Sequence, residues 1–203
     1  RTANGDTGQI ALGSGDLTIR TRQADPIIFN TNNAERLRID SSGRVLIGTT
    51  TEGEVSADDL TVVSSGNTGI TVRSGTSNSG NLFFSDGTSG NDEIRGYVQY
   101  LHSSNALLFG TNAGERARID SSGRLLVGTD APGSSGVDNL VLYRNGNGGI
   151  TIRNAANQNG NLFFSRATSG TGEYEGYIQY QHAQDVMVFG TDHTERLRIT
   201  SDG

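Results

Sequence analysis

Residues 35–49 read ERLRIDSSGRVLIGT, and this stretch decides the fold because it returns 80 residues further along the chain. Residues 115–129 read ERARIDSSGRLLVGT, and a third copy begins with ERLRI at residues 195–199. A register that recurs at a fixed period indicates a repeat architecture, in which each unit packs against its neighbours. The recurrence therefore favours an elongated fibre over a compact enzyme.

The stretch itself has the pattern of a β-hairpin. Residues 36–40 alternate between charged and apolar, with Leu37 and Ile39 on the apolar side, and a period of two is typical of a strand. The following DSSG segment, residues 40–43, has Asp first and Gly fourth, which predicts a type I turn closed by a bulge. The return strand, residues 44–48, carries three successive apolar residues, so we expect both of its faces to be covered.

The repeat extends well beyond the hairpin. Residues 69–120 and 149–200 are identical at 26 of 52 positions without a gap. Short strands are predicted at roughly ten-residue spacing, separated by Gly, Ser or Asn, over residues 97–102, 106–109, 115–119 and 124–128. Glycine-rich loops are predicted at 74–80, 86–91 and 146–149, and no segment has the helical period with caps. The predicted fold is an all-β meander.

We divide the chain by this repeat into three domains. Residues 1–50 form a partial repeat that ends in the hairpin, residues 51–130 form a full repeat, and residues 131–203 form a second repeat. The last segment, Thr200-Ser201-Asp202-Gly203, aligns with the turn at 40–43, so the second repeat stops inside its final turn. We therefore expect the chain to be a fragment of a longer polypeptide.

The composition leaves little material for a core. Leu, Ile, Val and Phe make up about 23% of the chain, just above the roughly 20% below which disorder is expected. Each hydrophobic face is therefore expected to be buried partly against other copies of the chain. An isolated meander also leaves unpaired strand edges, which such copies would cover.

The charged residues exclude some partners. The net charge is −6 and no basic stripe exists, so nucleic acid is an unexpected partner. No apolar run is long enough to insert into a membrane, and the lack of cysteine excludes disulfides and thiolate metal sites. All 16 basic residues are arginine, which indicates either ordered ion-pair ladders with carboxylates or compositional drift of the source genome.

The stretch 31–49, TNNAERLRIDSSGRVLIGT, with its copies at Glu115 and Glu195, resembles the repeats of tail fibre proteins of tailed bacteriophages, frequent in viruses of marine bacteria. The resemblance implies a β-prism or triple-β-helix shaft made of an intertwined homotrimer. It also implies an extracellular place on the virion, and the number three comes from this resemblance alone. The implied partners are other copies, other tail proteins of the virion, and a host surface glycan or outer-membrane receptor.

In that family the pattern often precedes a C-terminal intramolecular chaperone that is released by self-cleavage. The catalytic residues of that chaperone are not in this sequence. A Ser-Asp pair of the kind that can mark the cleavage point occurs at Ser201-Asp202, but it lies in the turn of the repeat, which favours a turn over a cleavage point.

Candidate chemical groups recur with the repeat. His102 and His182 are equivalent, and in a trimer each could form a ring that binds a divalent metal; we favour a strand-end histidine that recurs with its repeat. Glu93 and Glu173 are equivalent carboxylates of the kind that cleave glycans, but an active site rarely needs a copy in every repeat. Four tyrosines could stack on sugars, although cross-strand packing is the favoured interpretation: Tyr97, Tyr100, Tyr177 and Tyr180.

The recurring glutamates Glu35, Glu115 and Glu195 are interpreted as rungs that pair with arginines of neighbouring chains. No nucleophile turn, phosphate loop, calcium loop or zinc spacing occurs. We therefore predict no catalytic residue, no cofactor and no metal site, and a structural shaft that supports host attachment. The alternatives are a bacterial extracellular filament or adhesin and, second, a glycan-degrading tailspike.

Overall fold

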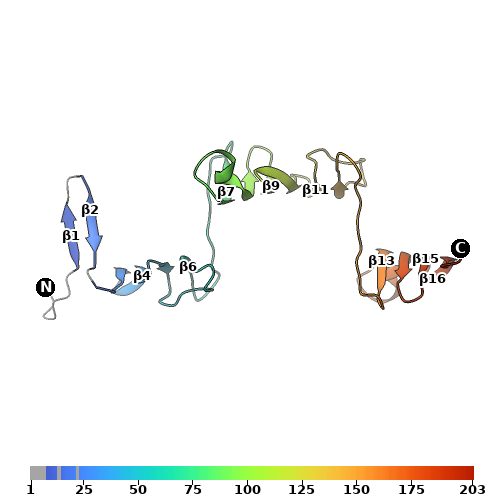
Figure 1. The fold of residues 1–203 in the computed structure, drawn as a ribbon, viewed down its shortest axis with the longest axis horizontal. Helices are drawn as coiled ribbons and strands as arrows, with labels where there is room; N and C mark the ends of the chain where they lie inside the picture. The colour runs from blue at the N-terminus through green and yellow to red at the C-terminus, as the bar shows by residue number, and fades with distance from the viewer. Residues whose placement is uncertain (1–7, 13–14, 22) are drawn as a thin grey trace. The chain divides into compact units, whose positions relative to one another are not determined.

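The computed structural model describes residues 8–12, 15–21 and 23–203, which form β-sheets joined by turns and two short 3-10 helices (Figure 1). The first compact unit spans residues 1–73. It contains the hairpin of β1 (Gln9–Leu12) and β2 (Leu17–Arg20) and a sheet in the order β3-β4-β5-β6. The strands of that sheet are β3 (Ile27–Thr31), β4 (Ala34–Ile39), β5 (Val45–Ile47) and β6 (Leu60–Val62).

The second unit spans residues 74–203 and contains two sheets. The β7–β12 sheet comprises β7 (Ser79–Phe84), β8 (Gly96–Leu101), β9 (Ala106–Thr111), β10 (Gly114–Ile119), β11 (Leu125–Val127) and β12 (Leu140–Leu142). The β13–β16 sheet comprises β13 (Asn159–Phe164), β14 (Gly176–Gln181), β15 (Val186–Thr191) and β16 (Thr194–Ile199). The 3-10 helices η1 (Gly90–Ile94) and η2 (Gly170–Tyr174) connect the first two strands of each sheet.

The predicted all-β class is confirmed, and the four predicted strands of the full repeat correspond to β8–β11 within two residues at each end. Two loop predictions need correction, because β7 begins inside the 74–80 segment and η1 begins inside the 86–91 segment. The pairs β5–β6 and β11–β12 join residues on either side of positions 50 and 130. The sheets are therefore offset from the repeat units as divided above.

The predicted hairpin turn is confirmed in detail. Gly43 has φ +87°, its N–H donates to the Asp40 carbonyl at 3.0 Å, and the Asp40 N–H donates to the Arg44 carbonyl at 3.0 Å. The Asp40 carboxylate accepts from the backbone N–H of Ser42 at 2.9 Å and of Arg44 at 3.0 Å. An L residue with a side chain is strained at this φ, so Gly closes the turn. Asp120, Ser122, Gly123 and Arg124 repeat these bonds.

A bulge in the strand that carries the recurring glutamate decides which residues share a face. In β10, Glu115 lies opposite Gly110 and Ala117 lies opposite Phe109, so Arg116 is an extra residue without a partner. Residues i and i+3 of a regular strand point to opposite faces. The extra residue places Glu115 and Arg118 on the same face. The same register shift occurs in β4 and β16.

The core lies on the face that carries these arginines, here called the covered face. Leu108, Arg118 and Leu126 lie side by side in neighbouring strands, and Leu126 is completely buried. The equivalent Leu46 is 1% exposed and lies beside Arg38. The aliphatic stems of the arginines therefore contribute to the core around these leucines.

A crossover that the sequence pattern did not predict covers this face. β5 and β6 are parallel, as are β11 and β12, and parallel neighbours require a crossover connection. In the first crossover, the Gly53 N–H donates to the Thr61 hydroxyl at 3.0 Å, and Thr61 lies opposite Leu46. The crossover thus closes over the buried leucine.

One arginine of each repeat ties this crossover to the hairpin turn. Arg124 contacts Asp120 at 2.6 Å and Asp138 of the crossover at 2.8 Å. Hydrogen bonds from the Arg124 guanidinium, joined by two backbone N–H groups, lower the pKa of Asp120. Arg44 repeats this arrangement with Asp40 and Asp58. Each turn therefore keeps its ionised aspartate in place through the same cation that holds the crossover.

Candidate functional site

The opposite face of the three larger sheets, here called the apolar face, is covered by no helix or strand among the described residues, although Ile152 lies beside Gly160 on this face of the β13–β16 sheet. In the β7–β12 sheet two cross-strand ladders run over it, Tyr100-Leu107-Ile119-Leu125-Leu140 and Leu82-Val98-Phe109-Ala117-Val127-Leu142. Directly opposed residues share a face, so the ladders form one continuous surface. Every member is apolar or aromatic.

The apolar face is too large for an isolated chain in water. Phe84 and Leu82 are 58% exposed, and Phe109 and Ile119 are about 40% exposed. At about 200 Å² for each large side chain, the exposed ladder members of this one sheet present on the order of 700 Å². Monomeric proteins rarely expose a contiguous apolar patch larger than a few hundred Å², and larger patches mark interaction sites.

The other sheets carry the same ladders. In the β3–β6 sheet they read Ile27-Ile39-Val45-Leu60 and Phe29-Leu37-Ile47-Val62. In the β13–β16 sheet they read Tyr180-Met187-Ile199 and Leu162-Ile178-Phe189-Leu197. The apolar face is therefore a property of the repeat.

The return strand of the hairpin corrects one prediction. Leu46 and Leu126 are buried, but Leu125 and Val127 remain 40% and 36% exposed on the apolar face. Within one chain, only one face of this strand is covered. The middle one of the three successive apolar residues points to the covered face, and the other two point to the apolar face, which the chain itself leaves open.

The recurring glutamates pair inside the chain, so the prediction that they pair with neighbouring chains is wrong. Glu115 contacts Arg118 of the same strand at 2.5 and 2.6 Å, a bidentate pair made possible by the bulge. Glu35–Arg38 and Glu195–Arg198 repeat it. The hydrogen bonds from Arg38 lower the pKa of Glu35. These pairs fix the bulge and orient the arginine stems beside the core.

The two equivalent histidines lie beside tyrosines. The His102 ring meets the Tyr100 ring edge-on at 4.9 Å, and His182 meets Tyr180 at the same distance. Among the described residues, no group of three or more His, Cys, Asp or Glu side chains could hold a metal ion.

The remaining candidates lie apart from one another. Glu93 is exposed in η1 of the β7–β12 sheet, and Glu173 is exposed in η2 of the β13–β16 sheet. The two carboxylates therefore do not form a pair within one sheet. Ser201-Asp202 lies in an exposed turn, where the Gly203 N–H donates to the Thr200 carbonyl at 3.1 Å.

The four tyrosines divide between the faces. Tyr97 and Tyr177 lie on the covered face, each with its ring over a glycine, Gly110 or Gly190. Tyr100 and Tyr180 lie on the apolar face, where the Tyr180 hydroxyl donates to the Asp185 carboxylate at 3.0 Å. That hydrogen bond raises the pKa of Tyr180.

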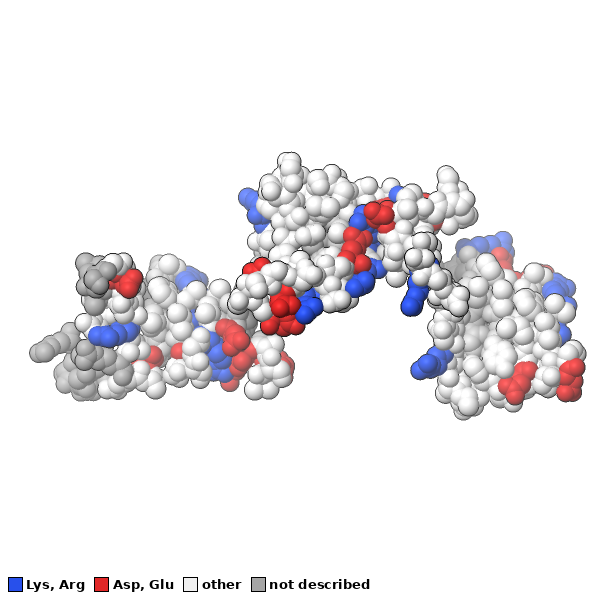
Figure 2. All heavy atoms as spheres, turned by 45° about the horizontal axis from the view of Figure 1, so that its top comes forward, with Lys and Arg blue, Asp and Glu red and all other residues white. Residues whose placement is uncertain are grey.

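Charges are spread in small groups in which acidic and basic side chains lie next to each other, with uncharged surface between them (Figure 2). This pattern matches the short-range pairs described above. On the face that Figure 2 shows, the described residues form no wide field of one sign of the kind that attracts a charged polymer.

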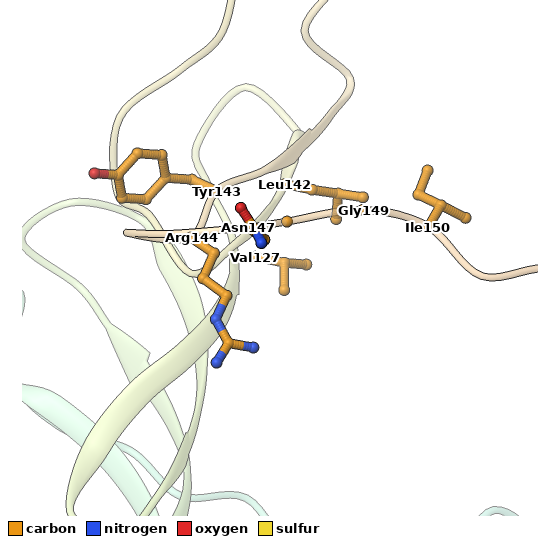
Figure 3. Close-up of a pocket in the computed structure, with 8 residues that line it drawn as sticks. Val127, Leu142, Tyr143, Arg144, Asn147, Gly149 and Ile150 are labelled. Carbon is orange, nitrogen blue, oxygen red and sulfur yellow. The ribbon is translucent and has the colours of Figure 1, made fainter.

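An open hollow of about 700 Å³ lies where the chain leaves β12 (Figure 3). Val127 and Leu142 at the end of one apolar ladder form one side, and Ile150 extends the wall. Ile150 is 71% exposed. The hollow continues the apolar face and carries no cluster of titratable groups, so we interpret it as part of that surface.

A comparison with models of known protein families gives no match, and neither does a comparison with curated proteins. The described part of the chain contains no helix with the length and apolar character needed to cross a lipid bilayer. The apolar face is therefore the strongest functional feature that the geometry offers.

Proposed function

We propose that the chain is a shaft segment of a homotrimeric viral tail fibre that supports attachment to the host cell surface. The observation that carries the proposal is the apolar face, which recurs at equivalent positions in three sheets and which the chain itself leaves uncovered. Other copies of the same chain are the occupants that a repeated, identical surface favours. The number three and the viral origin rest on the resemblance of residues 31–49 to tail fibre repeats.

The mechanism of such a shaft is mechanical. Three chains whose apolar faces turn inward would bury the ladders and leave the covered faces, with their ion pairs, toward solvent. Repetition then extends one packing solution along an axis. A stiff assembly holds binding tips away from the particle, and display of three copies raises avidity without new contacts.

The mass of the protein in solution tests the proposal. Size-exclusion chromatography with light scattering is expected to give three times the chain mass of 21.4 kDa. The homotrimer would be contradicted by a protein that keeps the mass of a single chain at micromolar concentration while its circular dichroism spectrum shows folded β-sheet.

A bacterial extracellular filament or adhesin would use the same apolar face. The neighbouring genes separate the two functions, because capsid and tail genes indicate a virus and secretion genes indicate a bacterial surface protein. Release of oligosaccharides from host polysaccharide would instead support the tailspike.

A further inference from the structure

The second repeat carries a hollow lined by aromatic side chains, here called the aromatic hollow. It measures about 310 Å³ and is lined by Phe163, Tyr174, Tyr177, Gln179 and His193. Phe163, Tyr177 and Gln179 lie on the covered face of the β13–β16 sheet. In the proposed trimer this face is turned to solvent.

Three elements of the β13–β16 sheet hold the aromatic rings in place. The Tyr177 ring lies over Gly190, where a Cβ would come within 2.1 Å of it. Tyr174 comes from η2, and its ring lies 6.2 Å from Phe163 and meets His193 edge-on at 5.4 Å. The backbone N–H of His193 donates to the backbone carbonyl of Glu175 at 3.4 Å. The walls are thus fixed by the sheet, by η2 and by the turn before β16.

One residue that lines the hollow has a polar atom without a partner. The Nδ1 atom of His193 is buried and forms no hydrogen bond, while the side chain as a whole is 25% exposed. A buried polar atom without a partner is costly. The Gln179 amide already donates to Asn161 at 2.6 Å and accepts from Gln181 at 2.7 Å. The His193 imidazole is therefore a polar ring of the lining with a buried nitrogen that has no hydrogen bond among the described residues.

The charges around the hollow favour a neutral ligand. None of the lining residues is an arginine. The carboxylate of Asp192 lies 3.8 Å from His193 Nε2, and Glu175 is already paired with Arg166. An anionic ligand would meet no free cation in this lining and one nearby carboxylate.

We propose that the aromatic hollow binds a neutral pyranose ring. Such a ring offers an apolar C–H face to Tyr174, Tyr177 and Phe163, and hydroxyls to the exposed part of the His193 imidazole and the tyrosine hydroxyls. Ligand sites combine aromatic walls with a few placed polar groups in this way, and the volume lies at the small end of their range. That the sugar comes from a glycan of the host surface rests on the proposed function. The presence of the pocket in the β13–β16 sheet does not depend on that function.

The chain contains its own control. In the first repeat Ile94 stands at the position of Tyr174, and Ala113 stands at the position of His193. The β7–β12 sheet forms with those residues in place. The double variant Tyr174→Ile/His193→Ala therefore restores a surface that this fold accepts.

Saturation-transfer NMR with methyl β-D-glucopyranoside and methyl β-D-galactopyranoside tests the proposal, with the His193 ring resonances followed in a titration. We expect binding of at least one of the two sugars with a Kd on the order of 1 mM. The double variant should weaken it at least about tenfold. The control Tyr143→Val replaces a tyrosine outside the hollow by its first-repeat counterpart and should bind as the parent does.

Lack of binding of both sugars by the parent, or unchanged binding by the double variant, would overturn the proposal. Loss of binding in Tyr143→Val would also overturn it, by moving the site to the hollow beside β12. Stronger binding of methyl β-D-glucuronide than of the neutral sugars would contradict the neutral ligand. A comparison of the affinities for host polysaccharide and for the monosaccharides in the same assay distinguishes the two sources. Tighter binding of the polysaccharide indicates a host glycan, and equal binding indicates free sugar.

The mass of each sample distinguishes this proposal from the shaft. A trimer that binds no sugar would overturn the sugar-binding proposal and support the shaft proposal. A monomer that binds sugar would overturn the shaft proposal and support the sugar-binding proposal.

Discussion

Phe83 and Phe84 are neighbours in β7 whose side chains point to opposite faces of the sheet, so they test which face assembles. Phe84 lies on the apolar face against Gly96 and is 58% exposed, and Phe83 lies on the covered face with its ring 6.5 Å from Tyr97 and is 45% exposed. The two side chains are about half buried in the single chain, so a substitution at either position costs the chain a similar amount of burial. A difference between them therefore reports on assembly.

The perturbation is the double variant Phe84→Asp/Phe164→Asp, and the matched control is Phe83→Asp/Phe163→Asp. With about 200 Å² per Phe side chain, the exposed 58% of Phe84 and 59% of Phe164 each correspond to about 120 Å², or together about 6 kcal/mol of burial for each chain at about 25 cal/mol per Å². Over three chains this reaches about 18 kcal/mol, a loss of about thirteen orders of magnitude in the trimer association constant. Burying the new carboxylate adds a further penalty.

The control is expected to lose the edge-on contact of Phe83 with Tyr97 and the tilted contact of Phe163 with Tyr174, about 1 kcal/mol of stability for each aromatic pair. Light scattering of both variants at micromolar concentration is the assay. We expect the Phe84 variant to be monomeric and the Phe83 variant to keep the mass of the parent. The reasoning is refuted if the Phe83 variant dissociates while the Phe84 variant stays assembled, because the two faces would then be reversed.

Further predictions concern the covered face. Gly110→Ala places a Cβ 2.1 Å from the Tyr97 ring and should destabilise the protein by about 1–3 kcal/mol in denaturant titrations. Because Arg124 lowers the pKa of Asp120 in the folded state, the stability from this pair is present above the ordinary value of 3.8 and is lost as pH falls through the folded-state pKa. Acid titration of thermal stability should show this loss. Arg124→Ala, which leaves Asp120 and Asp138 unpaired, should lower the melting temperature at pH 7 and have a smaller effect below that range; an equal effect at both pH values would contradict the pairing.

Local signals predicted the hairpin because its chemistry is contained in four residues. The Asp40 carboxylate and the Gly43 backbone need no distant partner to form the turn. The same holds for the strands of the meander, which pair with their sequence neighbours.

The bulge could not be predicted from alternation. Glu35, Leu37 and Ile39 keep a spacing of two residues on either side of Arg36, so the pattern looks regular although Glu35 has changed face. For this reason the sequence pattern paired Glu35 with an arginine of a neighbouring chain, whereas the structure pairs it with Arg38 of the same strand. A glutamate and an arginine three residues apart in a strand are the signal that could have revealed it, because they pair only across such a bulge.

The parallel strands β6 and β12 were missed because their partners are distant. β12 has three residues, and its pairing with β11 depends on a crossover held by Arg124 and Asp138. Short apolar segments such as Leu140–Leu142 have no periodicity that identifies their partner. The aromatic hollow was missed for a related reason, because it depends on Tyr174 and His193, two of the many positions at which the repeats differ.

The core of the chain makes a last prediction about its stability. Among the described residues, the buried hydrophobic side chains are Leu46, Ala106, Leu108, Leu126, Val186 and Val188. The apolar ladders contain more and larger side chains than this set, so most of the available hydrophobic stabilisation is realised only when they are covered. Folding and assembly should then be linked by mass action, and the midpoint of thermal unfolding should rise with protein concentration. Calorimetry over a hundredfold dilution series measures this directly, and a midpoint that stays constant over the series would show that each chain is stable alone.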